Sequence, residues 1–68
     1  MASYYRNKNA QLNGDHEVHR SGCGYMPSQT NQHYLGEFYN CTDAVTAAKL
    51  HDSSADGCAY CSPACHTR

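Results

Sequence analysis

Hydrophobic residues are sparse along this chain, and three stretches carry a pattern typical of regular structure. Residues 15–20 alternate loosely between polar and apolar side chains around Val18, which predicts a strand. Residues 33–39 (His-Tyr-Leu-Gly-Glu-Phe-Tyr) are aromatic and half apolar, so they are the best strand candidate. Residues 42–51 are rich in alanine and predict a helix.

Local signals refine these elements. Asn40 or Thr42 can cap the predicted helix, and three residues would share its apolar face at positions i, i+4 and i+7: Cys41, Val45 and Ala48. Ser62-Pro63 combines a capping residue with a proline suited to the first helical turn, so a short C-terminal helix is expected from residue 62.

The N-terminal residues differ in composition from the rest. Residues 1–14 are rich in Asn, Lys and Gln and end at Asn13-Gly14, a turn signal. We therefore expect a flexible segment over 1–14 and a single domain over 15–68. The fold class predicted for this domain is a small α+β fold stabilised by zinc, with a short antiparallel sheet of residues 15–20 and 33–39.

We expect a stabilising metal because the chain has few residues for a hydrophobic core. The chain has 68 residues, one Phe, no Trp and six Tyr. Domains of this size bury only about 60% of their unfolded surface and commonly need a disulfide or a metal to remain folded.

Two short motifs supply the ligands for such a metal. They are His19-Arg-Ser-Gly-Cys23 and Cys58-Ala-Tyr-Cys61, separated by 34 residues. Each short spacing lets one tight turn direct two ligand atoms at the same point, as a tetrahedral Zn²⁺ ion requires. We therefore predict zinc bound by His19, Cys23, Cys58 and Cys61.

The fourth ligand has alternatives, as does the role of the thiol pair. Cys65 lies one helical turn beyond Cys61 and could replace His19, and His16 or His66 are further candidates. Cys41 is most simply a small buried hydrophobe. Cys58 and Cys61 could also form a redox pair, since CxxC marks thiol oxidoreductases as well.

Charge and cysteine count bear on partners and location. The net charge is −1 and the basic residues are scattered, which argues for weak or no nucleic-acid binding. No stretch is apolar enough to predict a membrane span. Five cysteines cannot all pair as disulfides, so we expect reduced, mainly metal-bound thiols in the cytoplasm, in a monomeric protein.

The order of these motifs resembles the Ada-type metal-binding domain, the zinc module of bacterial DNA methyl-phosphotriester repair proteins. The residues that carry the resemblance are Val18 to Cys23, Leu35 to Phe38, Thr42 to Val45 and Asp56 to Cys61. It implies a small bacterial zinc protein of the His-xxx-Cys variety. In the repair proteins the first ligand is a methyl-accepting Cys; His19 stands at that position, so methyl transfer is not implied here.

The predicted function is a non-enzymatic module with a structural zinc ion that recognises a protein or a nucleic acid. Four protein ligands leave no open position for a catalytic water. The aromatic residues of 33–39 cannot all face inward, so an exposed aromatic face could dock a protein. The alternative is a thiol-based redox or metal-handling protein that uses Cys58 and Cys61.

Overall fold

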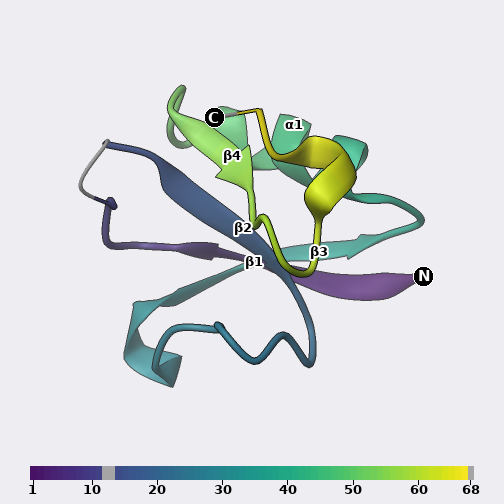
Figure 1. Cartoon of the computed structure of the whole chain (residues 1–68), viewed down its shortest axis with the longest axis horizontal. Helices are drawn as coiled ribbons and strands as arrows, with labels where there is room; N and C mark the ends of the chain where they lie inside the picture. The colour runs from purple at the N-terminus through teal and green to yellow at the C-terminus, as the bar shows by residue number, and fades with distance from the viewer. Residues whose placement is uncertain (12–13, 68) are drawn as a thin grey trace.

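A computed structural model describes residues 1–11 and 14–67 and folds them into one mixed sheet with a helix on one face (Figure 1). The strands are β1 (Ala2–Asn7), β2 (His16–Arg20), β3 (Gln32–Phe38) and β4 (Ala55–Gly57). Helix α1 spans Cys41–Lys49, and two 3-10 turns cover Gln29–Asn31 (η1) and Pro63–Cys65 (η2). The predicted α+β fold class is confirmed.

The sheet has the strand order β3-β1-β2-β4. β1 pairs antiparallel with both β2 and β3, whereas β4 pairs parallel with β2. Both predicted strands are therefore present, but β1 lies between them. Its register with β3 shifts between Tyr4 and Tyr5, and Tyr4 pairs with Gly36, whose φ of 128° is favoured only by glycine.

The structure differs from the prediction for residues 1–14, which the composition suggests to be a flexible segment outside the domain. Ala2–Asn7 is instead an inner strand of the sheet, and Tyr4 is only 5% exposed. The physical reason is alternation: Tyr4 packs into the core while Tyr5 contacts Tyr34 on the opposite face. The turn predicted at Asn13-Gly14 includes Asn13, which lies outside the described residues.

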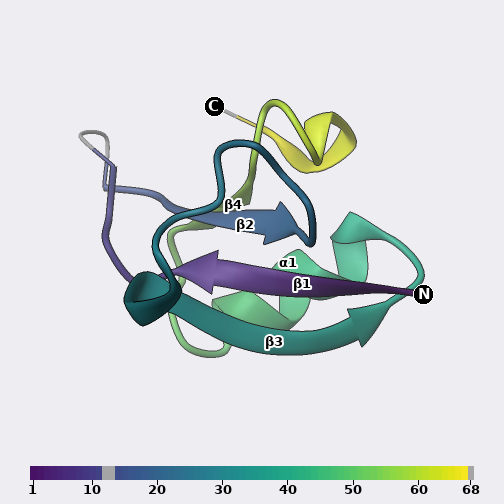
Figure 2. The same ribbon diagram turned by 90° about the horizontal axis from the view of Figure 1, so that it is seen from below.

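Helix α1 forms close to where the sequence predicts it. The Asn40 side chain caps its N-terminus by accepting a hydrogen bond from the Asp43 amide at 2.9 Å. Three residues on one side are buried: Ala44, Val45 and Ala48. The helix covers one face of the sheet, whereas the segment between β2 and η1 passes over the other (Figures 1 and 2).

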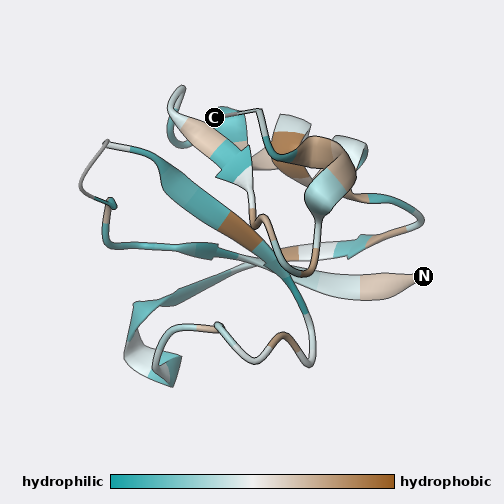
Figure 3. Ribbon diagram, viewed as in Figure 1, coloured by the Kyte–Doolittle hydropathy of each residue, from teal (hydrophilic) through white to brown (hydrophobic). Residues whose placement is uncertain are grey.

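The hydrophobic core is small and lies between α1 and the sheet. Strongly hydrophobic residues are few and lie mainly in β2 and α1 (Figure 3). The core cluster contains Tyr4, Val18, Ala44, Val45, Ala48, Ala55 and Cys65. Two of the four largest fully buried side chains, His19 and Cys58, are instead predicted metal ligands. Among the described residues, no helix is long and apolar enough to cross a membrane.

Candidate metal centre

The pairing of β2 with β4 brings the two ligand motifs together. These neighbouring strands run parallel, with Val18 opposite Gly57, so their C-terminal ends lie at the same edge of the sheet. The Cys58 amide extends the ladder by donating to the Val18 carbonyl at 3.0 Å. His19 on β2 is therefore beside Cys58, although they are far apart in sequence.

Each motif ends in a tight turn that returns its second ligand to the same point. After β2, the Cys23 amide donates to the Arg20 carbonyl at 3.1 Å, and Gly22 permits the turn with a φ of 90°. After β4, the Ser62 amide donates to the Cys58 carbonyl at 2.9 Å, which holds Cys61 in the intervening turn. The two turns thus face each other across the ends of β2 and β4.

The result is a cluster of three thiols and one imidazole. The ligand atoms of His19, Cys23, Cys58 and Cys61 all lie within 4.8 Å of one another, and this group could hold a metal ion. The Cys23 and Cys58 sulfurs are 3.9 Å apart, as are the Cys61 sulfur and His19 Nδ1. Thiolates about 2.3 Å from a tetrahedral ion would lie about 3.8 Å apart. These two distances are therefore close to the spacing of ligands around one central ion.

Backbone amides point at all three sulfurs. The Tyr25 amide donates to Cys23 Sγ and the Tyr60 amide to Cys58 Sγ, both at 3.4 Å. The Arg20 amide donates to Cys61 Sγ at 3.2 Å. Such N–H donors stabilise a thiolate more than a neutral thiol. The backbone is thus arranged for three deprotonated sulfurs, the form in which cysteine binds metal.

The His19 side chain is fully buried, and its two ring nitrogens have different surroundings. Nδ1 faces Cys61, whereas Nε2 is buried without a hydrogen-bond partner among the described residues. Burial lowers the pKa of His19, and the nearby Glu17 carboxylate opposes this shift. A neutral imidazole keeps the lone pair that a metal requires. The buried environment of His19 therefore suits a metal ligand.

Glu17 places a carboxylate beside the outer nitrogen of that ring. Its Oε1 is 3.5 Å from His19 Nε2, a little too far for a hydrogen bond. Metal-binding histidines usually donate their other N–H to a carboxylate or carbonyl, which fixes the tautomer. Glu17 is therefore placed to orient His19, a role that the sequence prediction missed.

Two tyrosines join the turns on the outside. The Tyr25 ring stacks on the Tyr60 ring, with centroids 4.0 Å apart and an interplanar angle of 19°. Each tyrosine follows a thiol by two residues, and both remain exposed, at 60% and 70%. The stack connects the Cys23 turn to the Cys58 turn independently of the metal.

The two remaining cysteines form a disulfide, Cys41–Cys65. Cys65, the alternative fourth ligand in the sequence prediction, is therefore outside the cluster. The expectation of five reduced cysteines also differs from the structure, which has two bonded and three free thiols. A separation of 24 residues between the partners gives no local sequence signal for this bond.

The other histidine candidates have partners away from the cluster. His16 Nε2 is 2.6 Å from an Asp52 carboxylate oxygen, and His66 Nδ1 is 3.0 Å from the Gly57 carbonyl. The structure thus brings together the four residues predicted first and none of the alternatives. Comparison of the chain with family models, with curated proteins and with solved structures found no match in any of the three.

Proposed function

We propose that this protein is a non-enzymatic zinc module in which one Zn²⁺ ion, bound by His19, Cys23, Cys58 and Cys61, holds the fold together. The observation that carries the proposal is the convergence of four ligand atoms within 4.8 Å. Three thiolates and an imidazole are typical ligands of structural zinc, and a complete set of four protein ligands leaves no position for a reacting water.

The same cluster favours a metal site over a redox pair. A redox CxxC motif needs an accessible attacking thiol, but Cys58 is fully buried and Cys61 is only partly exposed. A third thiol and an imidazole beside the pair have no role in dithiol exchange, whereas a metal would use both. Bound metal would also explain why three amides point at the sulfurs.

Kinship with the Ada-type domain is part of the proposal, as are a bacterial origin and a cytoplasmic location. The spacing of the ligand motifs and the helix between them support the first. His19 at the first ligand position argues against methyl acceptance, since an imidazole has no thiolate sulfur to alkylate. The thiols of the candidate site must be reduced to bind a metal, and reduced thiols are typical of the cytoplasm. The Cys41–Cys65 disulfide, in contrast, is typical of an oxidising compartment.

A protein is the better proposed partner. Tyr34 and Tyr39 on and beside β3 are 53% and 84% exposed, while their neighbours Leu35 and Phe38 pack against the core. Exposed aromatic side chains are enriched at protein interfaces. The net charge of −1 offers little attraction for a phosphate backbone.

Matched variants test the ligand set. His19→Ala should release zinc from the native protein, as should Cys58→Ser. The control is the double variant Cys41→Ala/Cys65→Ala, which removes the disulfide and should retain one zinc per chain by native mass spectrometry. Zinc retained by His19→Ala but lost from the double variant would contradict the assignment and place Cys65 in the site.

A further inference from the structure

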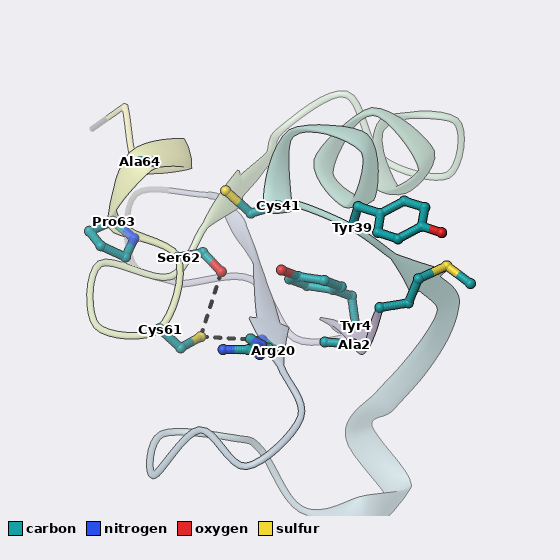
Figure 4. Close-up of a pocket in the computed structure, with 10 residues that line it drawn as sticks. Ala2, Tyr4, Arg20, Tyr39, Cys41, Cys61, Ser62, Pro63 and Ala64 are labelled. Carbon is teal, nitrogen blue, oxygen red and sulfur yellow. Dashed lines mark hydrogen bonds between the residues drawn. The ribbon is translucent and has the colours of Figure 1, made fainter.

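A cavity of about 370 Å³ opens beside the metal centre, between β1, the end of β2 and the segment that follows Cys61 (Figure 4). Its volume lies in the range of small-molecule sites, about 300–1,000 Å³. Figure 4 shows that polar groups gather at one end, where the Tyr4 and Ser62 hydroxyls lie near Cys61 and Arg20. Ala2 and Tyr39 line the opposite, less polar end.

Two groups at the polar end, the Tyr4 hydroxyl and the Arg20 guanidinium, lack a carboxylate partner among the described residues, whereas the Ser62 hydroxyl lies 3.8 Å from Cys61 Sγ. The Tyr4 ring is packed in the core, yet its hydroxyl has no hydrogen-bond partner in the described part of the chain. The Arg20 guanidinium likewise has no carboxylate partner within residues 1–11 and 14–67. Neither Asp nor Glu is among the described residues that line the cavity. The wall therefore presents the Arg20 cation and the Tyr4 hydroxyl, with the Cys61 sulfur as its anionic group.

A carboxylate matches this wall. Its two oxygens only accept hydrogen bonds, and a guanidinium binds them in a bidentate manner that a neutral amide or alcohol cannot reproduce. The Cys61 sulfur is the unfavourable neighbour for an anion, but it already accepts the Arg20 amide, and a bound metal would neutralise much of its charge. The opposite end would cover an apolar substituent.

We propose that this cavity binds a small carboxylate with an apolar substituent about the size of an amino-acid side chain. The inference goes beyond the zinc module: it depends on the shape and donors of the cavity and not on the identity of the metal. The ligand could be a free carboxylic acid or the end of a peptide chain, because both present the same chemistry.

Titration of the metal-loaded protein followed by amide chemical shifts tests the proposal. The probes are N-acetyl-leucine, its amide and a tripeptide that ends in leucine. At least one carboxylate probe should shift the amides of Ala2, Arg20 and Ser62, with affinity at least about tenfold higher than that of the amide probe. The stronger of the two carboxylates identifies the source. No shift, or equal binding of the amide, would overturn the proposal.

Two variants connect the binding to the cavity. Arg20→Gln and Tyr4→Phe should each weaken the carboxylate probe at least about fivefold. The control variants Lys8→Gln and Tyr34→Phe remove a positive charge and a tyrosine hydroxyl elsewhere in the protein, and they should bind the probe as the wild type does. The Arg20 side chain is exposed and its amide is retained in the variant, so this test does not depend on folding. Unchanged binding by Arg20→Gln would contradict the proposal. Zinc content measured on the same samples separates this outcome from failure of the metal assignment.

Discussion

At the scale of single residues, the candidate metal centre depends on how the His19 ring is held. Its burial lowers the pKa of the imidazole and so disfavours the charged form. Its inner nitrogen faces the thiols only if the ring keeps one orientation. Glu17 lies on the same face of β2, two residues earlier, with its carboxylate beside the outer nitrogen. The carboxylate and the imidazole are therefore expected to act together.

We predict that Glu17→Ala lowers zinc affinity about 10- to 100-fold while the protein remains folded in excess zinc. Glu17→Gln should keep most of the wild-type zinc affinity, because an amide oxygen can still accept a hydrogen bond from the His19 Nε2–H group. Glu37→Ala is the control, since Glu37 is an exposed acidic residue on β3. Competition with a chelator measures the affinities, and an unchanged zinc affinity in Glu17→Ala would refute the orienting role.

A second residue-scale feature is His33, which lies against Arg6 on the neighbouring strand. Arg6 Nε donates to His33 Nδ1 at 3.3 Å, and the His51 ring contacts the His33 ring edge-on at 4.6 Å. Burial, followed by the charges of Arg6, His51 and Lys8, lowers the pKa of His33 from its ordinary value of 6.5. The folded protein therefore takes up this proton less readily than the unfolded chain does.

The sign of the pH effect follows from that difference. Below about pH 6.5 the unfolded state binds a proton that folded His33 resists, so stability should fall as the pH is lowered until the folded pKa is reached. His33→Gln keeps an acceptor for Arg6 but does not titrate. Urea unfolding at several pH values should show the wild type losing stability relative to His33→Gln as the pH falls through about 6.5. Parallel curves would contradict the prediction, because titration of the metal ligands is common to both proteins.

At the scale of elements, the short strand β4 decides whether the site assembles. It pairs with β2 and packs against η2, where Gly57 lies directly against Cys65. The disulfide to Cys41 ties η2 to the start of α1. The Cys58–Cys61 turn is thus held between β4 on one side and η2 on the other.

Gly57→Ala should destabilise the protein by roughly 1–3 kcal/mol, because the new Cβ would lie 2.6 Å from Cys65 Cβ and 2.8 Å from the Cys65 carbonyl carbon. Cys65 cannot move freely because of its disulfide. Gly24→Ala provides the matched control, since a Cβ there meets nothing within 4 Å. Equal urea midpoints for the two zinc-loaded variants would contradict the close packing of β4 against η2.

Some of these elements can be predicted from the sequence pattern and others cannot, for physical reasons. The motifs around Cys23 and Cys58 are local turns, so spacing predicts that the two ligands within each motif lie close together, although it leaves alternatives for the fourth ligand. Glu17 could also have been found, since strand alternation places it on the His19 side. Strand β4 has only three residues and no hydrophobic alternation, and it pairs with a distant segment. Strand β1 was concealed by the polar residues that follow it, and the disulfide depends on tertiary proximity.

At the scale of the whole molecule, the hydrophobic core is small. The core cluster contains three alanines and a single valine from each of β2 and α1. The remaining cross-links are the disulfide between α1 and η2 and the candidate metal between β2, its following turn and the Cys58–Cys61 turn. Metal binding in such a small domain contributes directly to the free energy of folding.

The most direct test is stepwise chelation of the purified protein, followed by native mass spectrometry and amide chemical shifts on the same samples. We expect one zinc ion per chain, and we expect the dispersed amide spectrum to collapse in proportion to the zinc removed. One equivalent of added zinc should restore it, because the ligand set is complete within the chain. A metal-free protein with a fully dispersed spectrum would contradict the central claim that zinc holds this fold together.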